Sequence, residues 1–186
     1  MSIPPEERKM LLDLARQAVA AAVKGQTPPA PDRTGGVLGE HLGCFVTLKS
    51  GPDLRGCIGT FTPDKPLAET VVEMATAAAM KDPRFAGNRI TPEELEELSV
   101  ELSVLSPLEQ TDAPERDIEI GTHGIYVHRG WQSGCFLPEV ATEMGWDAEA
   151  FLDHCCAGKA GLPVGAWRRD DTQVYMFTTE KIAAEA

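Results

Sequence analysis

The segment Leu98-Ser-Val-Glu-Leu-Ser-Val alternates apolar and polar side chains over its whole length. Successive side chains of a strand point to opposite faces, so this alternation predicts a strand with one buried face. Just upstream, Thr91-Pro-Glu-Glu has the threonine, first-turn proline and glutamate of a capping box, which predicts a short helix. An earlier helix is predicted from apolar residues at helical spacing, with Asp64 as its cap and an end before Pro83.

Two short β-prone runs precede these helices. Cys44–Lys49 and Leu54–Gly59 are separated by Ser50-Gly-Pro-Asp, a turn sequence, so they predict a hairpin. The predicted order is therefore strand, strand, helix, helix, strand.

The same order of elements is predicted again downstream. Its strands are residues 125–128, 135–137 and 172–178, and its helices are residues 138–144 and 148–157. An amphipathic helix opened by Pro4 or Pro5 and closed by Gly25 precedes both units. We expect an α+β fold of two repeats, with halves 40–106 and 117–180, in a single domain spanning the 186 residues.

Charge and composition exclude several classes of protein. The chain has 17 Lys and Arg against 29 Asp and Glu, a formal charge of −12, which argues against a nucleic-acid surface or an anionic membrane as the partner. The start lacks a basic segment leading into an apolar one, and no apolar run is long enough to span a bilayer. We expect a cytoplasmic protein.

The five cysteines predict reduced thiols rather than a disulfide framework. No pair has the C-x-x-C spacing, so a metal site local in the sequence is not expected. The phosphate-loop, dinucleotide, GxSxG and HExxH motifs are also absent from the sequence.

Glycines inside a predicted strand make Leu54-Arg-Gly-Cys-Ile-Gly-Thr-Phe the most unusual stretch. Gly56 and Gly59 indicate a bulge or the close approach of another backbone or a ligand. Along an extended chain Arg55 and Cys57 point to the same face, and a fixed guanidinium favours the thiolate of a neighbouring cysteine. Cys57 is therefore the candidate reactive thiol. The alternative is that Cys57 is a small buried hydrophobe and that Arg55 pairs with a carboxylate for stability.

At this point the sequence resembles a known family. Leu54 to Phe61 is similar to the signature of the AMMECR-type domain. Further motifs similar to those of the family follow in the expected order: Lys81-Asp-Pro-Arg-Phe, Ser103-Val-Leu-Ser-Pro, His123-Gly-Ile, Leu137-Pro-Glu-Val and Gly145-Trp-Asp. In bacteria and archaea the family is called AmmeMemoRadiSam system protein A. The resemblance implies that the two repeats surround a single barrel-like mixed sheet.

The resemblance also implies site residues. Cys57 and Arg55 are the candidate catalytic residues, and the candidate substrate-binding residues are Gly56, Gly59, Arg84, Phe85 and Glu139. Arg84 could grip a carboxylate or phosphate with two hydrogen bonds, or could form a surface pair after a helix. Glu139 lies in the first turn of a predicted helix, where a carboxylate is stabilised in any case.

Two functions are compatible with these residues. The family name implies a component of the AmmeMemoRadiSam system that acts with a Memo-type protein and a radical SAM enzyme, with a cleft around Arg55 and Cys57 that binds a small molecule. The alternative is a non-catalytic adaptor that uses the same motif to dock those partners, since no general acid and base can be placed together from the sequence. The substrate, the reaction and any cofactor stay unknown at this stage.

Overall fold

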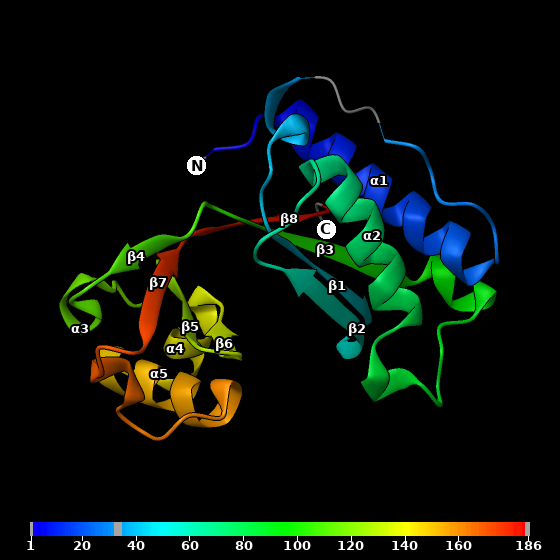
Figure 1. Ribbon diagram of the computed structural model, residues 1–186. Coiled ribbons are helices and arrows are strands. Elements are labelled where there is room, and N and C mark those ends of the chain that lie inside the picture. The colour runs from blue at the N-terminus through cyan, green and yellow to red at the C-terminus, as the bar shows by residue number, and fades with distance from the viewer. Residues whose placement is uncertain (1, 32–34, 185–186) are drawn as a thin grey trace. The chain divides into compact units, whose positions relative to one another are not determined.

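The computed structural model describes residues 2–31 and 35–184. Its fold is α+β, as predicted, with two four-stranded sheets (Figure 1). The chain divides into two compact units. The first comprises the described residues up to Leu105 and those from Glu180 onward, and the second runs from Ser106 to Thr179. The domain halves expected from the sequence stay a prediction.

The first unit holds two long helices and one sheet. Its elements are α1 (Pro5–Val23), a 3-10 helix (Gly36–Gly39), β1 (Cys44–Ser50), β2 (Asp53–Thr60), α2 (Leu67–Met80), two further 3-10 helices (Pro83–Phe85 and Pro92–Glu96), β3 (Leu98–Leu105) and β8 (Thr179–Ala183). The first residue of β8, Thr179, is assigned to the second unit. The N-terminal helix is confirmed. The helix expected after Thr91 is a 3-10 helix, and α2 starts after Pro66 without a side-chain cap, so the prediction that Asp64 caps it is wrong.

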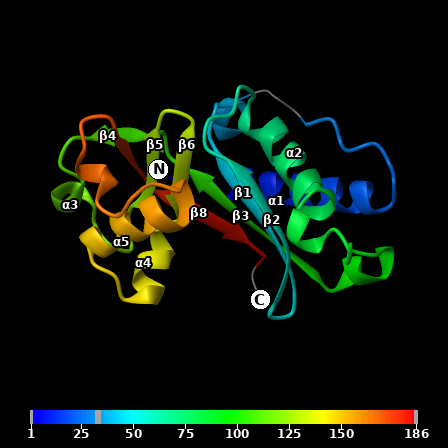
Figure 2. The same cartoon turned by 60° about the horizontal axis from the view of Figure 1, so that its bottom comes forward.

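The first sheet has the strand order β2-β1-β3-β8, and β1 is antiparallel to both β2 and β3. Its core face carries Val46 and Leu48 of β1 and Leu102 of β3, all buried. Helices α1 and α2 cover this face (Figure 2). Complete burial of each such side chain contributes about 1.5–3 kcal/mol. The opposite face, which carries Thr47 and Lys49, is left uncovered by these helices.

The second unit repeats the order strand, strand, helix, helix, strand. Its elements are β4 (Glu109–Thr111), α3 (Pro114–Asp117), β5 (Gly124–Arg129), β6 (Gln132–Phe136), α4 (Pro138–Met144), α5 (Ala148–Cys155), a π-helical turn (Cys156–Ala160), a 3-10 helix (Ala166–Arg168) and β7 (Gln173–Phe177). The sheet order is β4-β7-β5-β6, and β5 is antiparallel to β6 and β7. The central strand and its two partners therefore match β1, β2 and β3.

The fourth strands connect the two units. After β3 the chain forms β4, which pairs with β7, and after β7 it forms β8, which lies beside β3. The sheet of the second unit is thus completed by β4, which follows β3 of the first unit in the chain. The sheet of the first unit is completed by β8, which follows β7 of the second unit. The expectation of a single mixed sheet is wrong, because each sheet buries one face in its own hydrophobic cluster, and both have open strand orders rather than a closed barrel.

Among the described residues, no helix combines the length and the apolar character needed to cross a membrane.

Candidate functional site

A bulge in the β1–β2 hairpin determines where the residues of the glycine-rich stretch point. Lys49 pairs with Leu54, but the next pair is Leu48 with Gly56, so Arg55 has no partner across the ladder. Cys57 consequently pairs with Thr47. Regular pairing from the turn would have put Cys57 opposite Val46 on the core face. The extra residue therefore places the Cys57 thiol on the open face.

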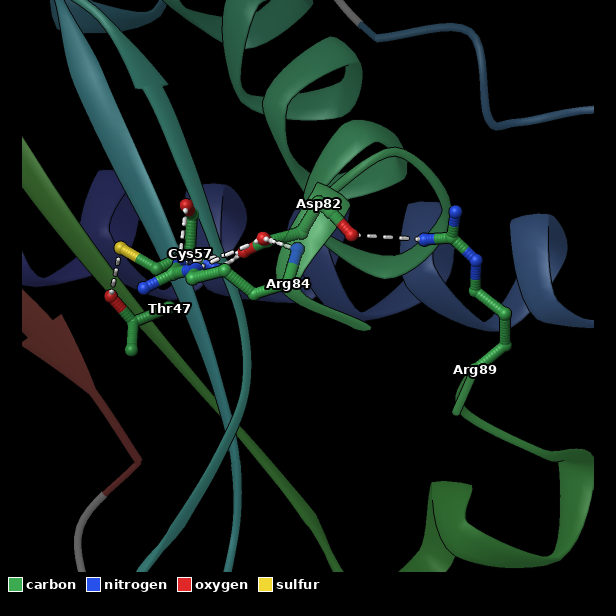
Figure 3. Close-up of polar contacts among 5 residues, drawn as sticks. All are labelled: Thr47, Cys57, Asp82, Arg84 and Arg89. Atoms are coloured by element: carbon green, nitrogen blue, oxygen red, sulfur yellow. Dashed lines mark hydrogen bonds and ion pairs between the residues drawn. The ribbon is translucent and has the colours of Figure 1, made fainter. Parts of the chain in front are cut away.

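The backbone of Cys57 is held by two side chains that follow α2. Because β2 is an edge strand, the outward N–H and C=O of Cys57 have no neighbouring strand to pair with. Asp82 Oδ2 accepts the N–H of Cys57 at 2.9 Å, and Arg84 Nη2 donates to its carbonyl oxygen at 3.3 Å (Figure 3). We call Asp82 and Arg84 the edge clasp.

Local sequence explains the geometry of the clasp. Asp82 precedes Pro83, which favours the extended conformation found there (φ −65°, ψ 115°) and ends the helix. The Asp82 side chain then accepts the backbone N–H of Arg84 at 3.1 Å and caps the 3-10 helix. Arg84 also donates through Nε and Nη2 to the two carboxylate oxygens, at 3.0 and 2.7 Å.

The clasp is electrostatically matched. The Asp82 carboxylate is buried, yet the hydrogen bond from Arg84 lowers its pKa to about 2, and the backbone N–H groups of Cys57 and Arg84 add to this effect. The pKa of Arg84 is raised, first by Asp82 and in smaller part by the Cys57 side chain. Half of the Arg84 side chain is exposed. A guanidinium therefore lies next to the thiol, and it belongs to Arg84.

The residue Cys57 is partly exposed. Its sulfur lies 3.4 Å from Thr47 Oγ1, on the side away from Asp82 (Figure 3). Thr47 pairs in turn with Glu101 of β3, so the three side chains form a row across neighbouring strands. The row brings together a thiol, a hydroxyl group and a carboxylate.

Arg55 is engaged elsewhere. Its Nε donates to Glu94 Oε1 at 3.0 Å and its Nη2 donates to Oε2 at 3.2 Å, and 10% of its side chain is exposed. The pairing of Arg55 with a carboxylate, weighed as the alternative from the sequence, is confirmed. Phe85 lies between the two guanidinium groups, with its ring centroid 5.9 Å from Arg55 Cζ and 5.6 Å from Arg84 Cζ.

A pocket of about 490 Å³ lies beside Arg55. It is lined by Ser50, Asp53, Leu54, Arg55, Phe85, Asn88 and Glu94. Cys57, which is one of the described residues, does not line this pocket. The structure thus puts Arg55 and Phe85 at one pocket and the Cys57 thiol on the open face of the sheet.

The glycines of the stretch have packing roles. A Cβ on Gly56 would collide with the backbone carbonyl of Ala78, which means that α2 approaches β2 at this point. A Cβ on Gly59 would collide with the ring of Phe45. In the second unit a Cβ on Gly134 would collide with the backbone at Ala160. The Gly-Cys step therefore serves the same purpose in both units, namely close contact between a helical segment and a strand.

The other predicted site residue, Glu139, belongs to the second unit. It lies half-buried in the first turn of α4, directly after Pro138. Among the described residues, no group of three or more His, Cys, Asp or Glu side chains is arranged to hold a metal ion.

Sequence reasoning missed Asp82, Thr47 and Glu101 as members of the site. Asp82 belongs to the motif Lys81-Asp-Pro-Arg-Phe, but no role was predicted for it, because its burial and its bond to the Cys57 backbone depend on the fold. Thr47 and Glu101 could be found only with the correct hairpin register, and the bulge at Arg55 changes that register.

Comparisons with known proteins agree with the motifs. The sequence pattern described as AMMECR1 matches residues 12–182. Protein MK0488 of Methanopyrus kandleri is 44% identical over 97% of this chain and 89% of its own, and a protein of Thermococcus gammatolerans is 44% identical over 96% and 90%. The crystal structure of the uncharacterized protein PH0010 from Pyrococcus horikoshii superposes with a TM-score of 0.84 and 42% identity, covering 96% of this chain and 92% of that one. The chain belongs to the AMMECR1 family.

Proposed function

We propose that this protein is a component of the AmmeMemoRadiSam system, acting with a Memo-type protein and a radical SAM enzyme, and that Cys57 is its reactive group. The observation that carries the proposal is that a partly exposed cysteine has a fixed backbone. The N–H and C=O of Cys57 are both held by the edge clasp, while its sulfur faces outward beside Thr47. Reactive groups need such positioning by a surrounding shell of fixed residues.

Each side chain near the sulfur has a role in this proposal. Cys57 is the nucleophile, thiol donor or redox group. Arg84 keeps a positive charge beside it, which would stabilise negative charge that develops on the sulfur during a reaction. Asp82 is a positioning residue, because it fixes both Arg84 and the Cys57 backbone. Arg55 supports the adjacent pocket through Glu94 rather than acting on the sulfur.

The rate of alkylation at neutral pH tests the proposal. In the variant Cys135→Ser, we expect iodoacetamide to modify Cys57 faster than the same cysteine in the urea-unfolded chain, and we expect Arg84→Gln to slow it several-fold. Arg168→Gln, a half-exposed arginine of the second unit, is the matched control and leaves the rate unchanged. The proposed thiol chemistry would be ruled out if Cys57 were alkylated no faster in the folded protein than in the unfolded chain and if Arg84→Gln left that rate unchanged.

A second candidate function is an adaptor for the same partners. The observation that favours it is that both arginines of the motifs form ion pairs, Arg55 with Glu94 and Arg84 with Asp82. Their positive charges are balanced within the protein. A docking surface would then be the pocket beside Arg55, with Leu54, which is 36% exposed, on its wall. An exposed apolar side chain at a pocket is typical of a binding hot spot.

Co-purification of the three proteins under anaerobic conditions tests the adaptor. We expect Leu54→Ser to weaken association, while Met10→Ser, at an exposed apolar residue of α1, leaves it unchanged. If the wild-type protein associates with neither partner, the adaptor function has no support.

A further inference from the structure

The pocket beside Arg55 has a buried guanidinium in its wall. Arg55 is 9% exposed, and it donates through Nε and Nη2 to the two oxygens of Glu94, with a longer bond from Nη2 to the backbone oxygen of Arg89 at 3.4 Å. A guanidinium carries five N–H donors, two of them on Nη1. Within residues 2–31 and 35–184, no group accepts a hydrogen bond from Arg55 Nη1. Two donors of Arg55 are therefore unused.

The unused donors are accessible from the pocket. Of the described side-chain nitrogen and oxygen atoms that are sealed from solvent, the one without a hydrogen bond is Thr76 Oγ1. Arg55 Nη1 also has no hydrogen bond, so it is not sealed, although nine-tenths of the side chain is buried. Because Arg55 lines a pocket of about 490 Å³, a molecule in the pocket can accept hydrogen bonds from Nη1. Pockets of this size bind small molecules.

The repeated fold does not require the bulge that inserts Arg55. The matching hairpin of the second unit pairs residue by residue along the whole of Gln132–Phe136. In the first unit the register shifts between Leu48 and Lys49, and Arg55 is the extra residue. Bulges re-aim side chains and are common beside functional sites. The first unit therefore carries an added arginine whose placement at a pocket points to a bound molecule.

Two further polar side chains line the pocket. Asp53 and Asn88 are both exposed, and in the described part of the chain neither side chain takes part in a hydrogen bond or an ion pair. Glu94 balances the charge of Arg55, so Asp53 leaves the pocket with a net negative charge. The walls therefore offer hydrogen-bond donors at Arg55 and an acceptor at Asp53, and they disfavour an anion.

An amide group matches this pattern of donors and acceptors. Its C=O accepts from a guanidinium, its N–H donates to a carboxylate, and it carries no charge. Asp53 and Arg55 are two residues apart on β2, at most about 7 Å along the strand, so both side chains can reach one amide. We propose that the pocket binds a small neutral molecule with an amide group, whose C=O accepts from Arg55 Nη1 and whose N–H donates to Asp53. Its apolar part packs against Leu54, which is 36% exposed. Because Cys57 does not line the pocket, this site goes beyond the proposed thiol chemistry.

Three pyridine probes that differ in one substituent test the chemistry of the pocket. At neutral pH nicotinamide carries an uncharged amide, nicotinate a carboxylate and the matching aminomethylpyridine an ammonium group. In titrations of the isotope-labelled protein, we expect nicotinamide to shift the NMR signals of Leu54, Arg55 and the Asn88 side chain. We expect the other two probes to bind about tenfold more weakly, because nicotinate is repelled by Asp53 and the ammonium group cannot accept from Arg55.

Variants assign the binding to the pocket. Asp53→Ala removes the acceptor at an exposed position, and we expect it to weaken nicotinamide binding about tenfold. Asp64→Ala, at another exposed aspartate of the same unit, is the matched control and leaves binding unchanged. Arg55→Met combined with Glu94→Ala removes the donors without leaving a buried charge, and binding should be lost while the circular dichroism spectrum stays native. Where this double variant fails to fold, the comparison of Asp53→Ala with Asp64→Ala still decides.

The amide site would be overturned by any of three results. Nicotinamide leaves the signals of Leu54, Arg55 and Asn88 unshifted up to its solubility limit, or Asp53→Ala binds it as well as the wild type does, or either charged probe binds equally well. Without small-molecule binding, the pocket is left to a partner's side chain, as in the adaptor function. None of the probes alkylates a thiol, so the result is independent of the reactivity of Cys57, and the amide site and the thiol chemistry can fail separately.

Discussion

Asp82 accepts the backbone N–H of Cys57 at 2.9 Å across the open edge of β2. The bond joins two motifs that are 25 residues apart in the sequence, the glycine-rich strand and Asp-Pro-Arg after α2. An edge strand exposes N–H and C=O groups that another chain can pair with. By occupying these groups at Cys57, Asp82 and Arg84 close the edge and fix the position of the thiol.

Replacing Asp82 should therefore destabilise the protein strongly. Asp82→Ala removes a buried carboxylate that accepts bonds from Cys57 and Arg84, and we expect it to lower the free energy of unfolding by about 3 kcal/mol. Urea unfolding followed by circular dichroism measures the change. Asp64→Ala, at an exposed position before α2, is the control and should cost less than about 0.5 kcal/mol. Equal losses in the two variants would contradict a structural role of the clasp.

The contribution of Asp82 should depend on pH. Its pKa is about 2 in the folded protein, below the ordinary value of 3.8, so its ionised form stabilises the fold above pH 4 and this stabilisation is lost as the pH falls towards 2. The contribution is about 2 kcal/mol. We expect the stability difference between wild type and Asp82→Ala to shrink by this amount between pH 5 and pH 2. A difference that stays constant over this range would contradict the assignment.

Gly56 should not tolerate a side chain. Even the methyl group of Gly56→Ala would meet the carbonyl of Ala78, and relief of this contact requires α2 to shift, at a cost of about 1–3 kcal/mol. Thermal unfolding measures the effect. Gly87→Ala is a matched control, because a Cβ there meets nothing within 4 Å, and it should be neutral or slightly stabilising. Similar unfolding temperatures for the two variants would show that α2 can move away at no cost.

The sequence predicts the repeated elements because their periodicity is local. The alternation from Leu98 and the helical spacing before Pro83 are each decided within a few residues. The strands β4 and β8 were missed, since Glu109–Thr111 has only three residues and Thr179–Ala183 has a single buried residue, Ile182, so neither shows a clear period. Without these two strands, the sequence could not show that each sheet takes its fourth strand from the chain that leaves the other unit. The sequence therefore predicted one barrel-like sheet instead of two.

The site was predicted in composition but not in arrangement. Arg55 and Cys57 were expected on one face from a period of two, but the bulge between Leu48 and Lys49 interrupts that period. The cation beside the thiol comes instead from Arg84, whose position depends on the turn at Asp82 and Pro83. A bulge and a turn together decide this site, and neither has a periodic signature.

The five cysteines should differ sharply in reactivity. Burial raises the pKa of Cys44 to about 12 and also raises the pKa values of Cys155 and Cys156, so these thiols are protonated and shielded at neutral pH. Cys57 and Cys135 are partly exposed. We expect iodoacetamide at pH 7.5 to label these two and to spare the other three until the protein is unfolded. Mass spectrometry of the peptides measures it, and labelling of Cys44 in the native protein would contradict the burial of β1.

The pair of Arg55 and Glu94 should be worth most when both partners are present. Glu94→Ala leaves a guanidinium that is nine-tenths buried without its carboxylate, and we expect a loss of about 2 kcal/mol. Arg55→Met with Glu94→Ala should cost less than the sum of the single changes, because the uncompensated charge is gone. The control Glu97→Ala, at an exposed residue after the same 3-10 helix, should change stability by less than about 0.5 kcal/mol. Strict additivity in the double variant would mean that the two side chains do not interact, and the wall of the pocket beside Arg55 would then need another support.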